Sequence, residues 1–206
     1  MTLNEATDRC ANDKINILIS GCTCSGKTTL ANSLCDNFKR SCTVVSQDNY
    51  FKNIEDIPVT KEKKLLFDSP NAFYINEFSA DMDGLISEGK VFIPNYSVKT
   101  NHRLSKDIEV LSSNINIFEG LHTIRTLRGF DNIFKIFLDT DIDLCLERRI
   151  ERDKKYGMSR ELVEEYFWKC IYPMYKSYIE NQKNLADYIV ESESDAECLQ
   201  KKLLQY

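Results

Sequence analysis

Short apolar runs alternate along this chain with longer segments in which apolar residues recur at helical spacing. The clearest run is residues 15–19, Ile-Asn-Ile-Leu-Ile, and similar runs lie at 42–46, 115–119, 134–138 and 188–190. Runs of this length are typical of buried strands in a parallel sheet. Because helical segments separate them, the pattern predicts an open, mostly parallel α/β sheet.

The segments between the runs predict the helices. Leu30, Leu34 and Phe38 lie four apart and place one apolar face on a helix that follows the first run. Ser69-Pro70 predicts a helix start, with serine as N-cap and proline at the first helical position, and Gly89 predicts its end. We expect further helices around residues 143–153, over 159–183 with a kink at Pro173, and over 195–205.

The loop after the first run carries the most specific motif. Residues 21–28 read Gly-Cys-Thr-Cys-Ser-Gly-Lys-Thr and match G-x-x-x-x-G-K-[ST] between a predicted strand and a predicted helix. Gly21 and Gly26 would let backbone N–H groups approach phosphate oxygens, and the helix N-terminus adds its dipole. Lys27 would supply charge to the β/γ-phosphates and Thr28 would ligate Mg²⁺. The predicted nucleotide-binding residues are Gly21, Cys22, Thr23, Cys24, Ser25, Gly26, Lys27, Thr28 and Thr29.

Length and charge limit the alternatives. At 206 residues the chain fits one domain, which we place at 14–206, after a polar N-terminal extension at 1–13. The net charge is −5 and no basic stripe occurs, which argues against a nucleic-acid partner. No run approaches the ~18 apolar residues of a membrane helix. Because the N-terminus lacks an apolar signal core, we expect a cytoplasmic protein.

The eight cysteines do not indicate a disulfide framework. The chain is long for a disulfide scaffold and no second pair has zinc spacing, so we expect reduced thiols. Cys22 and Cys24 lie beside helix N–H groups, which would favour the thiolate and oxidation. The alternative is that both are small loop residues.

Two acids follow predicted strands. Because ligands of such sheets bind beyond the carboxyl ends of the strands, we expect Asp48 beside the end of the first strand. There it could accept a proton from an attacking hydroxyl or hold a Mg²⁺-bound water, although aspartate also favours turns. Glu119 ends the third run, as a Walker-B acid does, and could coordinate metal or water; the alternative is a neighbour of a helix N-cap. The guanine-reading motif Asn-Lys-x-Asp is absent from the sequence.

An arginine-rich segment follows the fourth run. Arg149 and Arg152 are three residues apart and share one face of the helix predicted around residues 143–153. Phosphoryl transfer needs positive charge over the transferred group, often from a mobile lid, which we place at 143–160. The alternative is a solvated helix with ordinary ion pairs.

Aromatic and polar residues gather in two loop regions before Glu119. They are Phe67, Asp68, Tyr96, Asn101, His102 and Arg103. Such a set suits a ring stacked on tyrosine and a sugar diol held by aspartate. Taken singly, each residue could equally belong to the core or the surface.

The ordered series of motifs resembles the uridine kinase family. It comprises Gly21–Thr29, Ser46-Gln-Asp-Asn-Tyr-Phe51, Phe67-Asp-Ser-Pro70, Ile93-Pro-Asn-Tyr96, Phe118-Glu-Gly120, Leu138-Asp-Thr-Asp141, Arg148–Asp153 and Tyr172-Pro-Met-Tyr-Lys176. The resemblance covers roughly residues 14–192. It implies the three-layer P-loop NTPase fold, with helices on both faces of the sheet, a β-hairpin at 90–112 beside the substrate and a helical lid.

The resemblance also implies roles. Asp48 would be the general base on a nucleoside 5′-hydroxyl, and Asp68 would bind the ribose hydroxyls. Tyr96 would lie at the base, Arg149 and Arg152 would contact phosphates, and Glu119 would lie near Mg²⁺. On the same ground Tyr50, Phe67, Asn101, His102 and Arg103 are expected to bind substrate. ATP and Mg²⁺ are the implied cofactors, and homo-oligomer formation stays open.

Three positions differ from the family pattern. Asn101 stands where a base-reading histidine is common, Val98 replaces a second aromatic, and residues 156–158 read Tyr-Gly-Met where Arg-Gly-Arg is usual. From the motif series as a whole we expect a kinase that converts a pyrimidine nucleoside, uridine or cytidine, to its monophosphate. A related kinase acting on nicotinamide riboside or a sugar phosphate, and a non-catalytic nucleotide sensor, are the alternatives.

Overall fold

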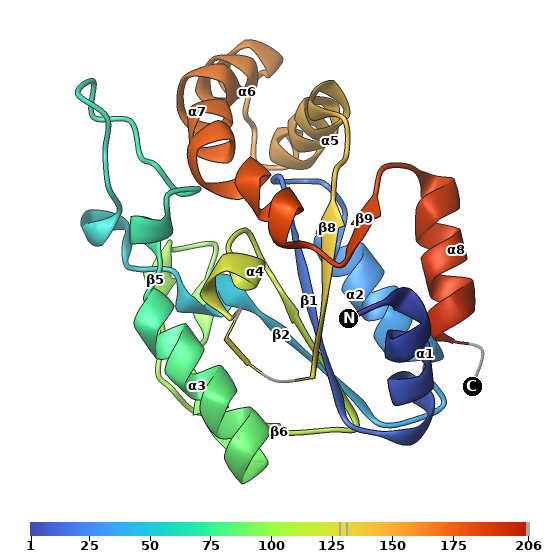
Figure 1. Ribbon diagram of the computed structural model, residues 1–206. Coiled ribbons are helices and arrows are strands. Elements are labelled where there is room, and N and C mark those ends of the chain that lie inside the picture. The colour runs from blue at the N-terminus through green and yellow to red at the C-terminus, as the bar shows by residue number, and fades with distance from the viewer. Residues whose placement is uncertain (128, 131, 205–206) are drawn as a thin grey trace.

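The computed structural model describes residues 1–127, 129–130 and 132–204. A five-stranded sheet lies at its centre, between helices on either side (Figure 1). The strands are β1 (Ile15–Gly21), β2 (Cys42–Ser46), β7 (Ile115–Glu119), β8 (Ile133–Leu138) and β9 (Tyr188–Val190). All are parallel, in the order β2-β7-β1-β8-β9. The predicted parallel α/β fold is therefore confirmed.

Alternation along the strands divides the core into two layers. In β1, Ile17 and Ile19 face one side of the sheet and Leu18 faces the other, since successive residues of a strand point to opposite faces. The isoleucine side packs on α1 (Leu3–Asn12), α2 (Lys27–Asn37) and α8 (Glu193–Leu203). The leucine side packs on α3 (Ile75–Glu88), α4 (Thr123–Thr126), α5 (Ile142–Lys154) and the helical segment from residue 160 to 185.

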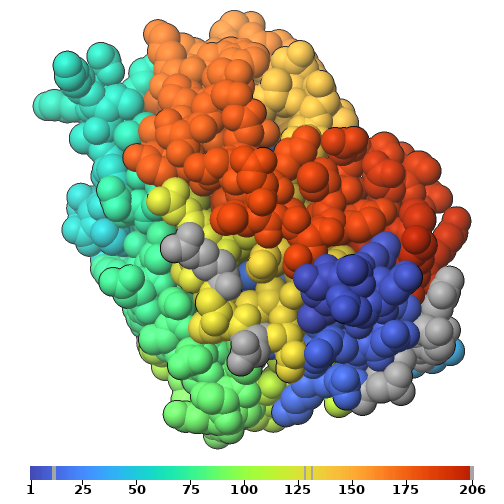
Figure 2. Space-filling model, in the orientation of Figure 1, coloured from blue at the N-terminus to red at the C-terminus, as the bar shows by residue number. Residues whose placement is uncertain are grey.

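The N-terminal segment is not a loose polar extension. Thr2 and Glu5 form a reciprocal capping box that starts α1, and Ala6 and Cys10 of this helix are buried. Helix α1 contacts α8, and in Figure 2 the blue N-terminal segment lies against the red C-terminal helix. The sequence prediction missed this helix because its apolar face is narrow and only tertiary contact buries it.

Strand order corrects one prediction. β7 lies between β1 and β2, so Asp48, which follows β2, is not beside the end of the first strand. Glu119, at the end of β7, occupies that neighbouring position and is in register with Ile19 of β1 and Ser46 of β2. Both carboxylates nevertheless lie at the carboxyl edge of the sheet.

Two helix predictions also needed correction. Ser69 does cap a helical turn, but this is a short 3-10 turn over Pro70–Ala72, and α3 begins only at Ile75. The segment from residue 160 to 185 is helical but not regular. It runs through α6 (Arg160–Tyr166), a π-helix (Phe167–Ile171), α7 (Tyr172–Met174), a second π-helix (Tyr175–Ile179) and a 3-10 helix (Glu180–Leu185). The π turns flank Pro173, whose missing N–H interrupts α-helical bonding.

Residues 90–112 form two small antiparallel pairs beside α3. β3 (Lys90–Ile93) pairs with β6 (Ile108–Leu111), and β4 (Tyr96–Ser97) pairs with β5 (His102–Arg103) at the tip. Within the described residues, no helix is long and apolar enough to cross a membrane. All eight cysteine thiols are free.

Candidate active site

The loop between β1 and α2 is shaped by close contacts. A Cβ atom at Gly21 would lie 2.7 Å from the carbonyl oxygen of Leu138, so this position has no room for a side chain. Gly26 has φ +102° at the N-cap of α2, a left-handed conformation that glycine adopts readily. Cys24 also has positive φ, at +56°. The loop thus turns its backbone towards the N-terminus of α2, as phosphate binding requires.

Lys27 and Ser25 have groups suited to a phosphate. The Lys27 amino group donates a 2.6 Å hydrogen bond to the carbonyl oxygen of Cys22 within its own loop. The buried Ser25 hydroxyl has no hydrogen-bond partner. Polar groups this well enclosed are normally paired, so a loop with an unused hydroxyl and a folded-back lysine fits the triphosphate of ATP.

A single cleft of about 1700 Å³ gathers most of the predicted site. It exceeds the ~300–1,000 Å³ typical of a pocket for one small molecule and leaves room for a nucleotide and an acceptor together. Within the P-loop, residues 23–29 line the cleft. Cys22 contributes its carbonyl to Lys27, but its side chain is buried in the core beside Cys145. The hydrogen bond with Cys145 and burial raise the pKa of the Cys22 thiol, which favours the structural interpretation of this residue.

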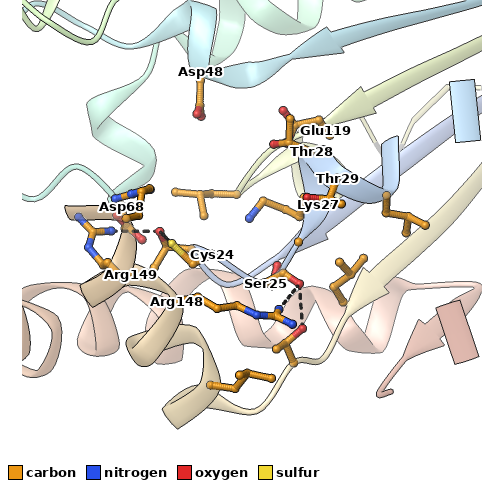
Figure 3. Close-up of a pocket in the computed structure, with 18 of the residues that line it drawn as sticks. Cys24, Ser25, Lys27, Thr28, Thr29, Asp48, Asp68, Glu119, Arg148 and Arg149 are labelled. Carbon is orange, nitrogen blue, oxygen red and sulfur yellow. Dashed lines mark hydrogen bonds between the residues drawn. The ribbon is translucent and has the colours of Figure 1, made fainter. Parts of the chain in front are cut away.

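The three acids that the sequence predicted for the site, Asp48, Asp68 and Glu119, all line the same cleft (Figure 3). Asp48 lies in the 3-10 turn after β2, and its backbone N–H donates to the Ser46 hydroxyl over 3.3 Å. Glu119 is 3% exposed and Asp68 is 5% exposed. One oxygen of Asp68, Oδ2, has no partner. The cleft therefore concentrates negative charge at the carboxyl edge of the sheet.

The surroundings shift the protonation of these acids. The Asp48 side chain is exposed to the cleft, but the walls of the cleft surround it. The resulting desolvation and the nearby Glu119 raise the pKa of Asp48 to about 6, although Lys27 lowers it. Burial likewise raises the pKa of Asp68, while Arg149 and Lys27 lower it. A carboxylate with a pKa near neutrality is suited to proton transfer.

Helix α5 brings arginines to the P-loop (Figure 3). Arg149 donates from Nη1 to the Thr23 hydroxyl at 3.0 Å, and its Nε lies 3.2 Å from Oδ2 of Asp153. Arg152 donates to the other Asp153 oxygen at 2.8 Å. The sequence prediction had not included Arg148, whose Nη1 donates to the carbonyl oxygen of Ser25 at 3.4 Å. Asp153 thus orients two of the three arginines of α5 that line the cleft.

Aromatic side chains gather at one end of the cleft. Phe51, Phe67 and Tyr96 line it, and Phe51 stacks on Phe73 with ring centroids 4.1 Å apart. The Tyr96 hydroxyl is buried and has no partner, and burial together with the Asp48 charge raises its pKa. The hairpin positions Val98, Lys99 and Asn101 also line this end, as do Tyr156 and Met158 after α5.

Three predicted acceptor residues lie elsewhere. Tyr50 is fully buried and its hydroxyl donates to Asp81 at 2.9 Å, so it supports the core. Arg103 forms a bidentate ion pair with Glu77, at 2.6 and 2.7 Å. His102 lies 3.3 Å from Glu55. None of these three side chains is among the described residues that line the cleft. Tyr50 points into the core, and β5 directs the side chains of His102 and Arg103 towards the loop before α3 and towards α3 itself.

The structure adds a set of cleft-lining residues that sequence reasoning had missed. Val190, Glu191, Ser192, Glu193, Ala196 and Gln200 line the cleft from β9 and α8. The rule that ligands bind beyond strand ends could have pointed to Val190, which closes β9. No local motif marks the α8 residues.

A buried pair ties the acidic loops together. The Gln47 side-chain oxygen accepts from the backbone N–H of His122 at 2.9 Å, and both residues are fully buried. Nε2 of His122 lies 3.1 Å from the carbonyl oxygen of Asp68. Gln47 precedes Asp48 and His122 lies just beyond Glu119, so this pair holds the three carboxylate-bearing segments in one arrangement.

The fold and the cleft together define a P-loop kinase of small molecules. A family model described as "Phosphoribulokinase / Uridine kinase family" matches residues 16–198. Two similar proteins are the uridine kinase of Lactobacillus johnsonii, 34% identical and covering 85% of each chain, and that of Lactobacillus helveticus, 32% identical over 84% of this chain and 83% of the relative. The chain belongs to the phosphoribulokinase/uridine kinase family, whose members are phosphotransferases that use ATP.

A solved structure shows the same fold. The structure of a possible uridine kinase from Bacillus stearothermophilus superposes with a TM-score of 0.59, at 21% identity, over 93% of this chain and all of that one. At this level of identity the likeness concerns the fold.

Proposed function

We propose that this protein transfers the γ-phosphoryl group of ATP to the 5′-hydroxyl of a pyrimidine nucleoside. The observation that carries the proposal is the position of Asp48. This acid shares one cleft with Lys27 of the P-loop and is close enough for the lysine charge to affect its pKa. The uridine kinase relatives favour uridine or cytidine as the acceptor.

The chain's own residues account for the steps. The P-loop and Lys27 hold the triphosphate at the N-terminus of α2, where the helix dipole favours negative charge. Asp48 accepts the proton of the acceptor hydroxyl while the hydroxyl oxygen attacks the γ-phosphorus of ATP. The bond between the γ-phosphorus and the oxygen of the β-phosphate breaks in the same step. Arg148, Arg149 and Arg152 stabilise the charge on the transferred group.

The donor set also suits Mg²⁺. Thr28 supplies a hydroxyl, and Glu119 and Asp48 supply carboxylates, which are the hard oxygen ligands that this ion takes together with water and phosphate. When bound, Mg²⁺ would neutralise charge on the β- and γ-phosphates. Turnover that persists after chelation of divalent ions would contradict this part of the proposal.

The acceptor would lie between the hairpin and Asp68. Asp68 has an unpaired oxygen for the ribose hydroxyls, while Phe51 and Tyr96 offer faces for the base. A sugar-phosphate acceptor is less well supported, because Arg103 is occupied by Glu77 and His102 lies outside the cleft. Of the basic residues proposed for such a substrate, Lys99 lines the cleft.

One experiment tests the proposal. Release of ADP is measured with ATP and Mg²⁺ against uridine, cytidine, adenosine, nicotinamide riboside, pantothenate and ribulose 5-phosphate. Stimulation by uridine or cytidine, with a ~10²–10⁴-fold lower kcat and unchanged ATP affinity in Asp48→Asn, is the expected result. Asp83→Asn, on the exposed side of α3, is the matched control.

The alternative outcomes are distinct. Stimulation by another compound alone would support kinase activity but identify a different acceptor substrate. Tight ATP binding with silence across the panel would favour a nucleotide sensor. Full turnover in Asp48→Asn would refute the role of this residue. Cytoplasmic location, the absence of nucleic-acid partners and homo-oligomer formation stay predictions.

A further inference from the structure

A second cavity lies between the N-terminal end of α3, helix α4 and the π-helical turn that contains Tyr178. Its volume is about 510 Å³, within the ~300–1,000 Å³ of typical small-molecule sites. It shares no lining residue with the large cleft. It is therefore a separate place where a small ligand could bind.

The polar side chains around this cavity are unused. They are those of Asn71, Asn76, Ser79, Arg125, Thr126 and Tyr178. Among the described residues, none of these side chains forms a hydrogen bond or an ion pair. The exposed guanidinium of Arg125 thus offers a positive charge without a carboxylate partner, surrounded by amide and hydroxyl groups.

His122 forms the inner wall and carries a second unused group. The residue is 0% exposed, and its Nδ1 has no hydrogen-bond partner among the described residues. Because Nε2 lies 3.1 Å from the Asp68 carbonyl oxygen, which can only accept, the proton is on Nε2. Burial lowers the pKa of His122 to about 4, with a contribution from Arg125. The ring is therefore neutral at physiological pH, and Nδ1 is a buried acceptor that lacks a donor.

These groups specify the chemistry of the ligand. We propose that the second cavity binds a small hydroxylated anion, whose charged group pairs with Arg125 and whose hydroxyl donates towards Nδ1 of His122. Because the ring is fully covered in this structure, the hydroxyl reaches Nδ1 once the side chains over the ring move aside. Sugar phosphates and hydroxycarboxylates share this chemistry. The neighbouring amides and hydroxyls supply the remaining hydrogen bonds.

The site is connected to the catalytic cleft. The Nε2 atom of His122 binds the backbone carbonyl oxygen of Asp68. The backbone N–H of His122 donates to the side chain of Gln47, which precedes Asp48 in the chain. A ligand that fixes the His122 ring would therefore change the apparent affinity for the acceptor. This coupling rests on the proposed function, whereas the binding site does not.

The test uses the full-length protein with a saturating non-hydrolysable ATP analogue and Mg²⁺, so that the P-loop is filled. Ribose 5-phosphate and citrate are titrated by calorimetry, with uncharged ribose as the control ligand. We expect at least one anion to bind the wild type, and ribose to bind much more weakly. Arg125→Gln should weaken anion binding by at least ~10-fold because the charge-assisted contact is lost. Ser79→Leu should block the cavity by its bulk.

The matched control is Lys39→Gln, which removes one positive charge from an exposed position outside both cavities and should leave binding unchanged. Absence of binding by the wild type, or equal affinity in Arg125→Gln, would overturn the site. Melting curves show whether Ser79→Leu folds. If Ser79→Leu does not fold, the affinity of Arg125→Gln for the anion still tests the site. Anion binding without any kinase activity would retain the site and reject the proposed function. An acceptor KM that the anion does not change would reject the coupling alone.

Discussion

The amino group of Lys27 is hydrogen-bonded to the carbonyl oxygen of Cys22, five residues earlier, at 2.6 Å. The amino group of Lys27 therefore has a hydrogen-bond acceptor within the loop that is expected to bind phosphate. Because this bond is one of several that hold the loop, the side chain is free to exchange it for phosphate oxygens. The same relationship indicates that loss of Lys27 should affect ATP use more than folding.

We expect Lys27→Met to lower kcat/KM for ATP by ~10²–10³-fold, since one preorganised charge on the transferred group is lost. Its melting temperature should stay close to that of the wild type. Steady-state ADP release and thermal unfolding measure both quantities. Lys39→Met, at an exposed position, is the control. Normal kinetics in Lys27→Met would contradict the assignment of the P-loop.

The pKa of Asp48 predicts a pH-dependent stability. A carboxyl whose pKa is raised to about 6 in the folded protein binds protons more tightly than in the unfolded chain. Its contribution to stability is present below pH ~4 and is lost as the pH rises through ~6. Asp48→Asn should therefore be more stable than the wild type at pH 8. Because water reaches Asp48 through the cleft, we expect at most about 1 kcal/mol, or ~2–4 °C.

Thermal unfolding of both proteins from pH 4 to pH 8 checks this expectation. The advantage of Asp48→Asn should shrink towards pH 4, where the wild-type carboxyl is also neutral. An advantage that is constant with pH, or largest in acid, would show that the Asp48 pKa is not raised.

Arg149 links helix α5 to the P-loop through Thr23. We expect Arg149→Ala to lower kcat by at least ~10²-fold while ATP still binds, since arginines over a transferred phosphoryl group contribute most in the transition state. Arg160→Ala is the matched control, because Arg160 pairs with Glu147 and Glu164 outside the cleft. Single-turnover phosphoryl transfer distinguishes the two. Equal rates in both variants would leave Arg149 with a structural role only.

Gly120 lies against Gln47 with no space for a side chain. A Cβ atom at Gly120 would lie 2.4 Å from the Cβ of Gln47, so Gly120→Ala must displace the segment that carries Asp48. We expect a loss of ~1–3 kcal/mol in the free energy of unfolding, together with reduced kcat. Gly84→Ala in α3 meets no atom within 4 Å and should instead stabilise the helix by ~0.5–1 kcal/mol. Denaturant unfolding measures both, and a stable, active Gly120→Ala would disprove the constraint.

The N-terminal helix should contribute to stability. Ala6 is 0% exposed within the cluster formed with α8 and the sheet. Ala6→Asp would bury an unpaired charge and should cost about 3–5 kcal/mol. Asn4→Asp adds the same charge on the exposed face of α1 and should change the free energy of unfolding little. If the two variants unfold alike, α1 does not pack as described.

Local sequence determined the strands and the P-loop. A strand buried on both faces is apolar at most of its positions, so the runs at 15–19, 115–119 and 134–138 are visible without any knowledge of their partners. The P-loop motif is contiguous, so its glycines and its lysine could be recognised together from the sequence. Asp48 and Glu119 could be found because strand ends share one edge of the sheet.

The tertiary structure decided what depends on distant segments. Insertion of β7 between β1 and β2 placed Glu119, rather than Asp48, beside the first strand. Tyr50 donates a hydrogen bond to Asp81 in the core, whereas its neighbour Phe51 lines the cleft. The two differ because α3 packs on one side of this turn. Contacts between residues far apart in the chain, such as His122 with Asp68, depend on how the layers pack, and neither composition nor periodicity encodes that packing locally.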